Sequence, residues 1–323
     1  MKTVLVVGGA GYIGSHTSKL LSKSGYKVVI FDNLSTGYEK LSIYGTLVVG
    51  DLSNQNEIDA VFKEYKIDIV FHFAAYSCVG ESVLNPQKYY KNNVQNTLNL
   101  LDAMLENNVK KIIFSSTCAV YGVPKYLPLD ENHSTNPINP YGKTKLIVEN
   151  ILEDYDKAYA LKYVILRYFN AAGADADAEI GEMHDPESHL IPLAIKALDS
   201  KGHKLQVFGD DYDTKDGSCV RDYIHVEDLA NAHLKAYEYL LKNNNSDIFN
   251  LGTETAYSVF DIIKTIQKLS SKKMHYTVSP RREGDPDSLL ASSKKAYEIL
   301  GWRATSSSIE KIIKSALKWH QKD

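Results

Sequence analysis

Tyr141 and Lys145 are the pair of residues in this sequence best suited to acid–base chemistry. Their spacing of four positions, in Tyr-Gly-Lys-Thr-Lys, places both side chains on one face if the segment is helical. A free phenol has a pKa of about 10, whereas a general base works best near 7. An ammonium group in a dry cleft stabilises the phenolate. We therefore expect Tyr141 to act as a base that Lys145 activates, although a surface tyrosine beside a solvated lysine would give the same spacing.

Three hydroxyl residues, Ser115, Ser116 and Thr117, follow an apolar stretch that predicts a buried strand over Lys111–Ser115. Ligands of a parallel sheet gather outside the carboxyl ends of its strands. A hydroxyl at this edge can share the proton that Tyr141 removes. The alternative is a cluster of hydroxyls that only cap backbone groups.

Gly8, Gly11 and Gly14 lie between a predicted strand and a predicted helix. Such a turn needs a residue without Cβ, lets backbone N–H groups approach a pyrophosphate, and brings the helix close to the sheet. The anion then lies at the positive end of the helix. Asp32 ends the next strand 18 residues after Gly14, the spacing of a carboxylate that holds a ribose, which favours NAD over NADP. A turn or capping aspartate is the other interpretation of Asp32. Asp51, directly after the third strand, is expected either to touch the adenine or to be a simple turn aspartate.

Strands alternate with helices along the first half of the chain. Strands are expected at 3–7, 27–31, 46–49, 69–73, 111–115 and 163–168, and helices at 12–24, 54–65, 86–107 and 140–160. This alternation predicts an α/β fold of the Rossmann type, a doubly wound parallel sheet covered on both faces. The second half predicts a smaller mixed α/β substrate domain: a loop over 171–186, a helix over 190–201, a strand over 205–208, a loop over 210–218, a brief strand followed by a helix over 223–241, and helices over 258–269 and 306–319.

The length of 323 residues fits two joined domains, which we place at 1–174 and 175–323, with 220–247 returning to the first. The net charge of −3 and the lack of a basic block disfavour nucleic-acid binding. Three cysteines without a C-x-x-C pair favour a reducing compartment, and we expect the cytoplasm. No stretch approaches the roughly 20 apolar residues of a membrane span, and we expect no metal site because no ligand cluster has metal spacing.

Ten motifs in order make the chain similar to the extended short-chain dehydrogenase/reductase family and, within it, to the nucleotide-sugar 4-epimerases. They are GGAGYIGSH at 8–16, FDNLSTG at 31–37, GD at 50–51, VGESV at 79–83, YYKNNV at 89–94, SSTCAVYG at 115–122, NPYGKTK at 139–145, LRYFNAAGA at 166–174, VRDYIHVEDLA at 220–230 and RREGDP at 281–286.

The resemblance implies an enzyme that keeps NAD bound and interconverts UDP-galactose and UDP-glucose at C4 through a transient 4-keto sugar, and a homodimer formed through the helices near 86–107 and 141–160. Tyr141 would be the base, with Thr117 and Lys145 beside it. The alternatives are a 4,6-dehydratase or a decarboxylase on the same scaffold, or a NAD-sensing regulator. Cys118 and Ala119 after Thr117 cannot supply the extra acid and base of a dehydratase.

The resemblance also implies the binding residues. The cofactor would be held by Gly8, Gly11, Tyr12, Ile13, Gly14, Asp32, Asn33, Asp51, Leu52, Phe73, Ala74, Ala75, Asn93, Ser115, Tyr141, Lys145 and Tyr168. The UDP-sugar would contact Thr117, Tyr141, Asn170, His189, Leu190, Gln206, Phe208, Arg221, Arg282, Asp285 and Leu289. The two arginines would pair with the diphosphate, because a guanidinium matches phosphate oxygens.

Three positions depart from the family pattern. Ser77 stands where many members carry a lysine that helps hold the cofactor. His189 stands where some carry an asparagine. Leu289 stands where some carry a tyrosine at the C2 side of the sugar, so a smaller side chain here would admit an N-acetyl group.

Overall fold

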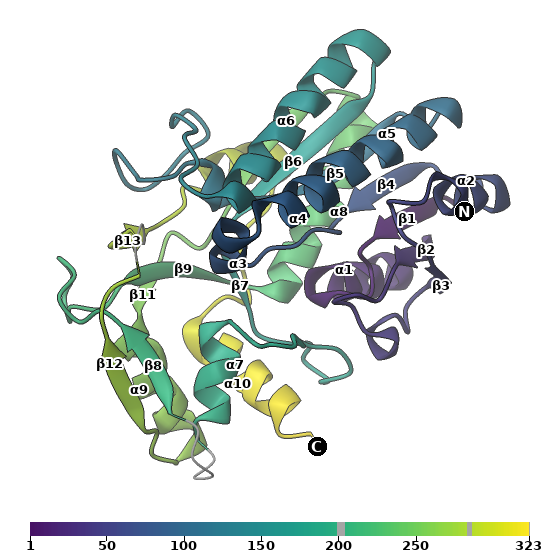
Figure 1. The fold of residues 1–323 in the computed structure, drawn as a ribbon. Helices are drawn as coiled ribbons and strands as arrows, with labels where there is room; N and C mark the ends of the chain where they lie inside the picture. The colour runs from purple at the N-terminus through teal and green to yellow at the C-terminus, as the bar shows by residue number, and fades with distance from the viewer. Residues whose placement is uncertain (199–203, 283–285, 323) are drawn as a thin grey trace.

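A seven-stranded parallel sheet forms the centre of the protein, seen here in a computed structural model that describes residues 1–198, 204–282 and 286–322. The strand order is β10–β6–β5–β4–β1–β2–β3, and every pair is parallel. The strands are β1 (Thr3–Val7), β2 (Lys27–Asp32), β3 (Thr46–Val49), β4 (Ile69–His72), β5 (Lys111–Thr117), β6 (Lys162–Tyr168) and β10 (Asp247–Leu251). The predicted doubly wound fold is confirmed, and its order reverses between β1 and β4 (Figure 1).

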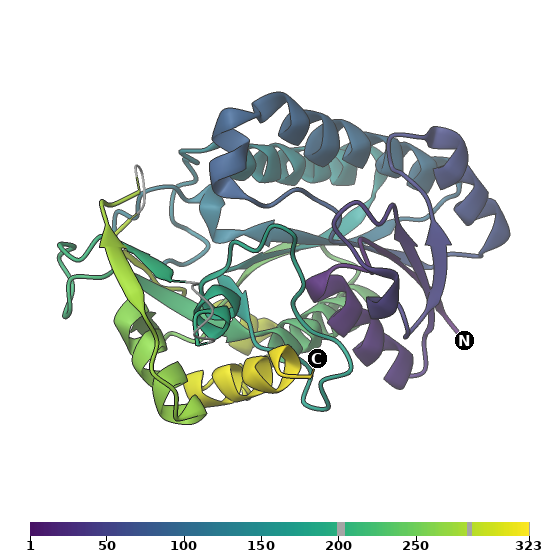
Figure 2. The ribbon, with the colours of Figure 1, turned by 60° about the horizontal axis from the view of Figure 1, so that its bottom comes forward.

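Helices cover both faces of this sheet. Val4 and Val6 of β1 pack with α1 (Tyr12–Lys23) and α8 (Val226–Asn243), whereas Leu5 and Val7 pack on the side of α2 (Gln55–Glu64), α5 (Asn96–Glu106) and α6 (Pro140–Tyr159). Both sets are fully buried because successive strand residues point to opposite faces. This explains the continuously apolar strands in the sequence. The two helical layers lie above and below the sheet in Figure 2.

The long helix predicted over 86–107 is interrupted. Its course consists of α4 (Pro86–Tyr90), a π-helical turn over Lys91–Gln95 and α5, preceded by the short α3 (Val79–Leu84). Asn93 lies in the π-helical turn, a feature that often marks a functional position. Further short helical turns are Glu39–Leu41, Cys118–Val120 and Ala296–Leu300.

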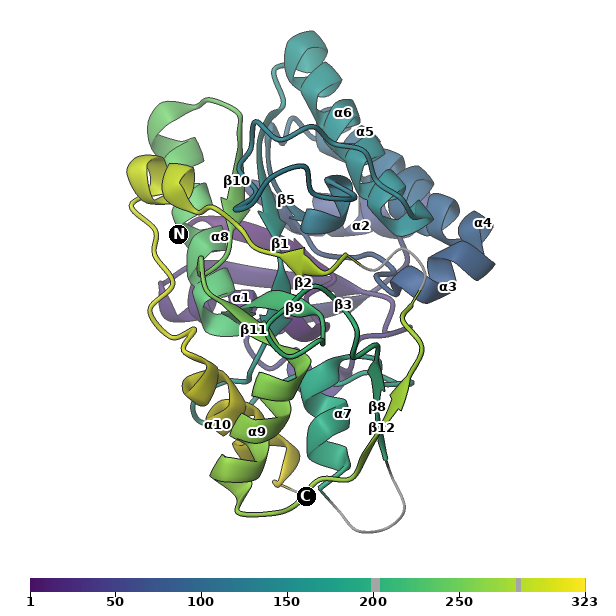
Figure 3. The ribbon, with the colours of Figure 1, turned by 90° about the vertical axis from the view of Figure 1, so that its left-hand side faces the viewer.

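A second group of elements lies beside the sheet and has its own apolar core (Figure 3). Strand β9 (Val220–His225) pairs with β7 (Asn170–Ala172) and β13 (Ser288–Leu289) in parallel and with β11 (Ala256–Ser258) antiparallel. Strands β8 (Leu205–Phe208) and β12 (Tyr276–Ser279) form a parallel pair. Helices α7 (Leu190–Lys196), α9 (Val259–Ser270) and α10 (Ile309–His320) bury Ile191, Ile262 and Ile313 between them.

The helix predicted from Tyr223 begins later than expected. Residues Val220–His225 are strand β9, and α8 starts at Val226, where the His225 side chain accepts a hydrogen bond from the backbone N–H of Glu227. Strand pairing with β7 outweighs the local helical pattern of these residues. After α8, strand β10 returns to the large sheet beside β6. None of the helices formed by the described residues is long and apolar enough to cross a membrane.

Candidate active site

Tyr141 lies in the first turn of α6, held there by the helix start. Asn139 accepts a hydrogen bond from Gly142 N at 2.8 Å, and Pro140 occupies the first helical position, where its missing N–H costs nothing. A Cβ on Gly142 would lie 2.6 Å from the carbonyl oxygen of Ala119, so the helix starts directly against the segment that follows β5. This contact brings the phenol of Tyr141 within hydrogen-bonding reach of the Thr117 side chain.

The electrostatics at Tyr141 differ from the sequence-based expectation. Burial raises the pKa of Tyr141 well above its ordinary value, the Tyr168 phenol raises it further, and only the hydrogen bond with Thr117 acts in the opposite direction. Lys145, whose own pKa burial lowers, is not among the groups that shift the pKa of the phenol. A positive charge brought by a ligand would favour the phenolate.

Lys145 is buried one turn further along α6. Its Nζ donates to the carbonyl oxygen of Ser115 at 2.8 Å and lies 4.9 Å from the centre of the Phe114 ring. Burial lowers the pKa of Lys145 to about 7, although the charge of Glu149 opposes this. The hydrogen bond uses one of three N–H donors, so the ammonium can serve a ligand as well.

The two serines at the carboxyl end of β5 have different partners. Ser115 hydrogen-bonds the hydroxyl of Tyr168, whereas Ser116 donates to Glu149, which forms a buried ion pair with Arg167. Ser116 thus belongs to a structural network under the site. The sequence reasoning missed Glu149, although its position four residues after Lys145 places it on the same face of α6.

The three glycines form a cradle at the point where the strand order reverses. Gly8 has a φ of +79°, and a Cβ there would lie 2.5 Å from Ala74 N, while a Cβ on Gly14 would lie 2.2 Å from Gly8 O. A Cβ on Gly11, the N-cap of α1, would meet only Gly8 O, at 3.3 Å. Contacts within the chain therefore require Gly8 and Gly14, whereas Gly11 leaves free the space in front of the helix. The first turn of α1 contains no acidic residue, which suits an anionic pyrophosphate.

Asp32 lies beside this cradle and also serves the turn. Its carboxylate accepts hydrogen bonds from Ala10 N and Leu34 N, both at 2.9 Å, and burial raises its pKa while these bonds oppose the shift. The turn interpretation of Asp32 is thus observed, and each oxygen keeps a further lone pair that is available to a ribose hydroxyl. Asp51 accepts a bond from Asn33 Nδ2 at 2.7 Å, whereas the Leu52 side chain is buried in the core.

The remaining expected cofactor residues occupy two segments. Phe73, Ala74 and Ala75 follow β4, and Phe73 N and Ala74 N both donate to Val7 O. The amide of Asn93 is occupied by the backbone of Tyr76 at 2.9 and 3.0 Å, so Asn93 positions this segment. At the start of α1, Ile13 is half-buried, and Tyr12 donates a hydrogen bond to Gly173 O at 2.5 Å. The exposed Ser77 lies just past the segment.

Among the expected substrate residues, Arg221 and Leu289 are neighbours on paired strands β9 and β13. The side chain of Arg221 is largely buried, and its charge partly offsets the effect of burial that raises the pKa of Cys118 to about 11. This places the guanidinium near the residue that follows Thr117. Leu289 packs against the small apolar cluster that contains Tyr121 and Phe169, and Asn170 is exposed at the start of β7.

A further pair of expected substrate residues lies on the second group of elements. The guanidinium of Arg282 lies 4.0 Å from the centre of the Phe208 ring, beside the exposed Gln206 of β8. Asp285 lies outside the described residues.

His189 and Leu190 mark the start of α7, and His189 has partners that the sequence reasoning missed. Glu182, His184, Glu187 and His189 offer ligand atoms that all lie within 4.8 Å of one another. The structure therefore brings together four potential metal ligands that the spacing in the sequence did not indicate. The signal in the sequence was the run E-x-H-x-x-E-x-H at 182–189. This run lies in a loop, where the side chains follow no fixed period.

Known proteins resemble this chain over nearly its whole length. The model of the NAD dependent epimerase/dehydratase family matches residues 4–252. A UDP-glucose 4-epimerase of Lactobacillus helveticus is 49% identical over 98% of this chain and 97% of its own length. The solved structure of UDP-glucose 4-epimerase from Brucella ovis in complex with NAD has a TM-score of 0.95 at 49% identity, covering 98% of both chains. That of the Bifidobacterium longum UDP-glucose 4-epimerase in complex with NAD+ and UDP has a TM-score of 0.95 at 41% identity, covering 100% of this chain and 99% of its own.

The glycine cradle, the tyrosine–lysine helix and these full-length matches agree. This chain belongs to the NAD-dependent epimerase/dehydratase family.

Proposed function

We propose that this protein interconverts UDP-galactose and UDP-glucose by inverting C4 through a transient 4-keto sugar. The observation that carries the proposal is the contact of Tyr141 with Thr117 at the carboxyl end of β5, next to a cradle for a dinucleotide. Relatives that match along their full length are named UDP-glucose 4-epimerases.

The residues of this site divide the work of a reversible oxidation. Tyr141 removes the proton of the 4-hydroxyl as C4 is oxidised, and it returns the proton after the keto sugar has turned in the pocket. Thr117 shares this proton through its hydrogen bond with the phenol. Lys145, anchored on Ser115, holds a ribose hydroxyl with its remaining donors. NAD, when bound, supplies the hydride acceptor and donor.

The cofactor fits the residues present. Gly11 and the first turn of α1 hold the pyrophosphate, and Asp32 holds the adenosine ribose and disfavours a 2′-phosphate. The segment 73–75 and Tyr168 border the nicotinamide end. Burial of Tyr141 makes the positive nicotinamide ring important for ionising the phenol, because Lys145 is directed toward the carbonyl of Ser115.

The nucleotide part of the substrate lies against β8 and β9 in this proposal. Arg221 and Arg282 pair with the diphosphate, and Gln206 and Phe208 border the uracil. The contact of Arg282 with Phe208 supports one shared subsite for these residues. Asn170 and Leu190 complete the pocket together with His189, which offers its Nε2 atom because its Nδ1 atom faces Glu182.

Leu289 sets which sugars fit. Its side chain lies on the strand next to Arg221, so it faces the region between the diphosphate and the reacting hydroxyl. A leucine here leaves room for an N-acetyl group at C2. We therefore include UDP-N-acetylglucosamine and UDP-N-acetylgalactosamine among the substrates.

We further propose a cytoplasmic homodimer that pairs the helices at 86–106 and 140–159. Exposed apolar side chains on α3 and α4, Val83, Leu84 and Tyr90, support a partner next to α6, on which both short helices pack. The free cysteines support a reducing compartment.

The test is conversion of UDP-galactose to UDP-glucose by the purified protein without any added electron acceptor. A 4,6-dehydratase would instead release water from the sugar. A decarboxylase would leave UDP-galactose unchanged, because this sugar has no carboxylate, and would release carbon dioxide only from a UDP-uronic acid. A regulator would bind NAD without turnover. Failure to convert UDP-galactose in protein that carries NAD would overturn the proposal.

A further inference from the structure

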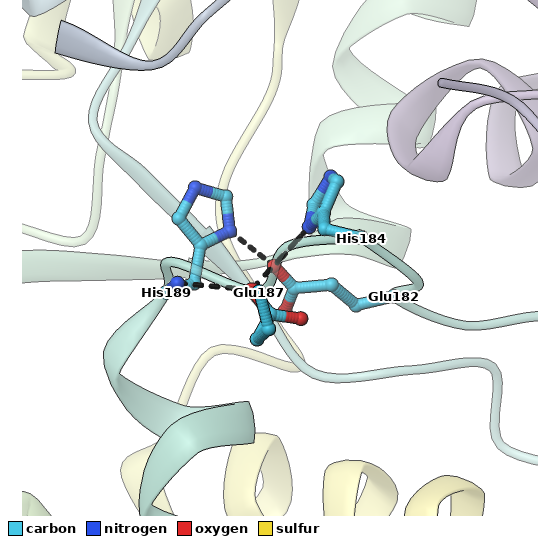
Figure 4. Close-up of side chains that lie close together, drawn as sticks. All are labelled: Glu182, His184, Glu187 and His189. Atoms are coloured by element: carbon cyan, nitrogen blue, oxygen red, sulfur yellow. Dashed lines mark hydrogen bonds and ion pairs between the residues drawn. The ribbon is translucent and has the colours of Figure 1, made fainter. Parts of the chain in front are cut away.

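A compact cluster of four potential metal ligands lies in the connection between β7 and α7. Glu182, His184, Glu187 and His189 converge there although none belongs to a long helix (Figure 4). Glu182 and Glu187 are almost fully enclosed, with side chains 4% and 3% exposed. Buried carboxylates need a counter-charge close by.

The distances within the cluster suit ligands of one ion. The Nδ1 atom of His184 lies 3.3 Å from Glu182 Oε1 and 3.5 Å from Glu187 Oε1. Ligand atoms on a tetrahedral zinc are about 3.4 Å apart when the bonds are about 2.1 Å long. His189 is closer to Glu182 than this, but its side chain is 50% exposed and can turn.

His184 provides a second, independent observation. Its Nδ1 atom is buried and lies within ion-pair distance of two carboxylates, but none of its contacts with the described residues has the geometry of a hydrogen bond. A buried nitrogen without a hydrogen bond is costly. An ion at the centre of the cluster would satisfy this nitrogen and both carboxylates at once.

We propose that Glu182, His184, Glu187 and His189 bind one zinc ion. Two imidazoles and two carboxylates form the tetrahedral nitrogen and oxygen set that suits zinc, whereas calcium and magnesium prefer oxygen alone. The protein fills all four positions, so the ion is structural.

The ligands are held in place by neighbouring groups, as expected of a metal site. Ser188 N and His189 N donate to Glu187 Oε1 at 2.8 and 2.9 Å. Trp319 of α10 donates to the carbonyl oxygen of Glu182 at 2.9 Å. The ion therefore ties the β7–α7 connection together beside the C-terminal helix.

The competing arrangement is an ion-pair network of protonated histidines without metal. Burial lowers the pKa of His184, but the two carboxylates outweigh this and raise the pKa to about 9. The other acidic cluster, Asp175, Asp177 and Glu179, is unlike this one because Lys19 already pairs with Asp175 and Glu179 at 2.6 Å.

The experiment uses untagged, NAD-loaded protein that has been treated with a chelator and dialysed. Zinc content is measured after addition of Zn2+ and gel filtration, and Co2+ is added in parallel to record the visible absorption of a tetrahedral site. The test variants are His184→Ala and the nearly isosteric Glu187→Gln. His275→Ala, at an exposed histidine far along the chain on the segment before β12, is the matched control.

We expect one zinc per chain, an intense Co2+ spectrum, and a thermal midpoint that rises on adding zinc. Each test variant should lower the affinity at least about tenfold, and the control should bind like the parent. Parent protein that loses its zinc on gel filtration and gives only the weak spectrum of octahedral Co2+ would overturn the proposal. Folded test variants that bind like the parent would overturn it as well. The zinc content, the Co2+ spectrum and the thermal midpoint are all independent of epimerase activity.

Discussion

The ammonium group of Lys145 donates to the carbonyl oxygen of Ser115 at 2.8 Å, one helical turn after Tyr141. The two residues share a helix face, yet the pKa of Tyr141 is raised by burial and the pKa of Lys145 is lowered by it. The site is therefore strongly desolvated, which strengthens any charge that a ligand brings.

Replacing Tyr141 by Phe removes only the hydroxyl. We expect turnover of UDP-galactose to fall by at least about a hundredfold, with the fold and the NAD content retained. Tyr159→Phe, on the exposed end of the same helix, is the control and should keep parent activity. A near-normal rate for the Tyr141 variant would mean that another group is the base.

The depressed pKa of Lys145 predicts a pH-dependent stability. Between pH 7 and the ordinary lysine pKa near 10.4, the unfolded chain binds more protons than the folded one, so the parent gains stability as pH rises. The gain is at most about 1.4 kcal/mol per pH unit, and below pH 7 the cost of the buried charge is fully present. Lys145→Met removes this dependence, so its stability advantage over the NAD-free parent should shrink from pH 6 to pH 10.

Chemical denaturation at several pH values measures this difference. Lys143→Met, two residues earlier and exposed, should show no such trend. A constant gap between parent and Lys145→Met would show that Lys145 titrates normally in the folded protein.

Alanine at two glycines should separate folding from cofactor binding. Gly14→Ala places a Cβ 2.2 Å from Gly8 O, and it should lower the free energy of unfolding by about 1–3 kcal/mol. Gly11→Ala meets only Gly8 O, at 3.3 Å, so it should destabilise the fold much less than Gly14→Ala but bind NAD at least about tenfold more weakly, which is ~1.4 kcal/mol. Thermal unfolding and retained NAD are the two measurements. Equal NAD affinity in Gly11→Ala would place the pyrophosphate elsewhere.

Leu289→Tyr should change sugar selectivity. A larger side chain beside Arg221 should lower the rate with UDP-N-acetylgalactosamine at least about tenfold more than the rate with UDP-galactose. Leu289→Met conserves the volume and should leave the ratio of the two rates unchanged. If the tyrosine variant lowers both rates equally, Leu289 is not the residue that selects the sugar.

The sequence predicted the elements whose pattern is local. Three elements begin where expected: the apolar strand β1, the helix α1 after its glycines, and the helix α6 at Pro140. Hydrophobic periodicity and residues that start or end helices determine these elements locally. Strand β10 was missed because Asp247–Leu251 mixes polar and apolar residues, and its place beside β6 depends on a distant strand. The direction of Lys145 and the convergence of Glu182 with His184 depend on tertiary contacts that no spacing in the sequence encodes.

Helix α8 is synthesised after most of the strands that it covers, and this order matters during biosynthesis. One face of the sheet, including Val6, Ile113 and Val164, packs against residues of α8 such as Leu229 and Tyr237. A ribosome adding about 5–20 residues per second needs several seconds to pass from Tyr168 to Val226. During this interval the nascent sheet exposes an apolar face and lacks its edge strand β10. The newly made chain therefore depends most on chaperones just before its last third emerges.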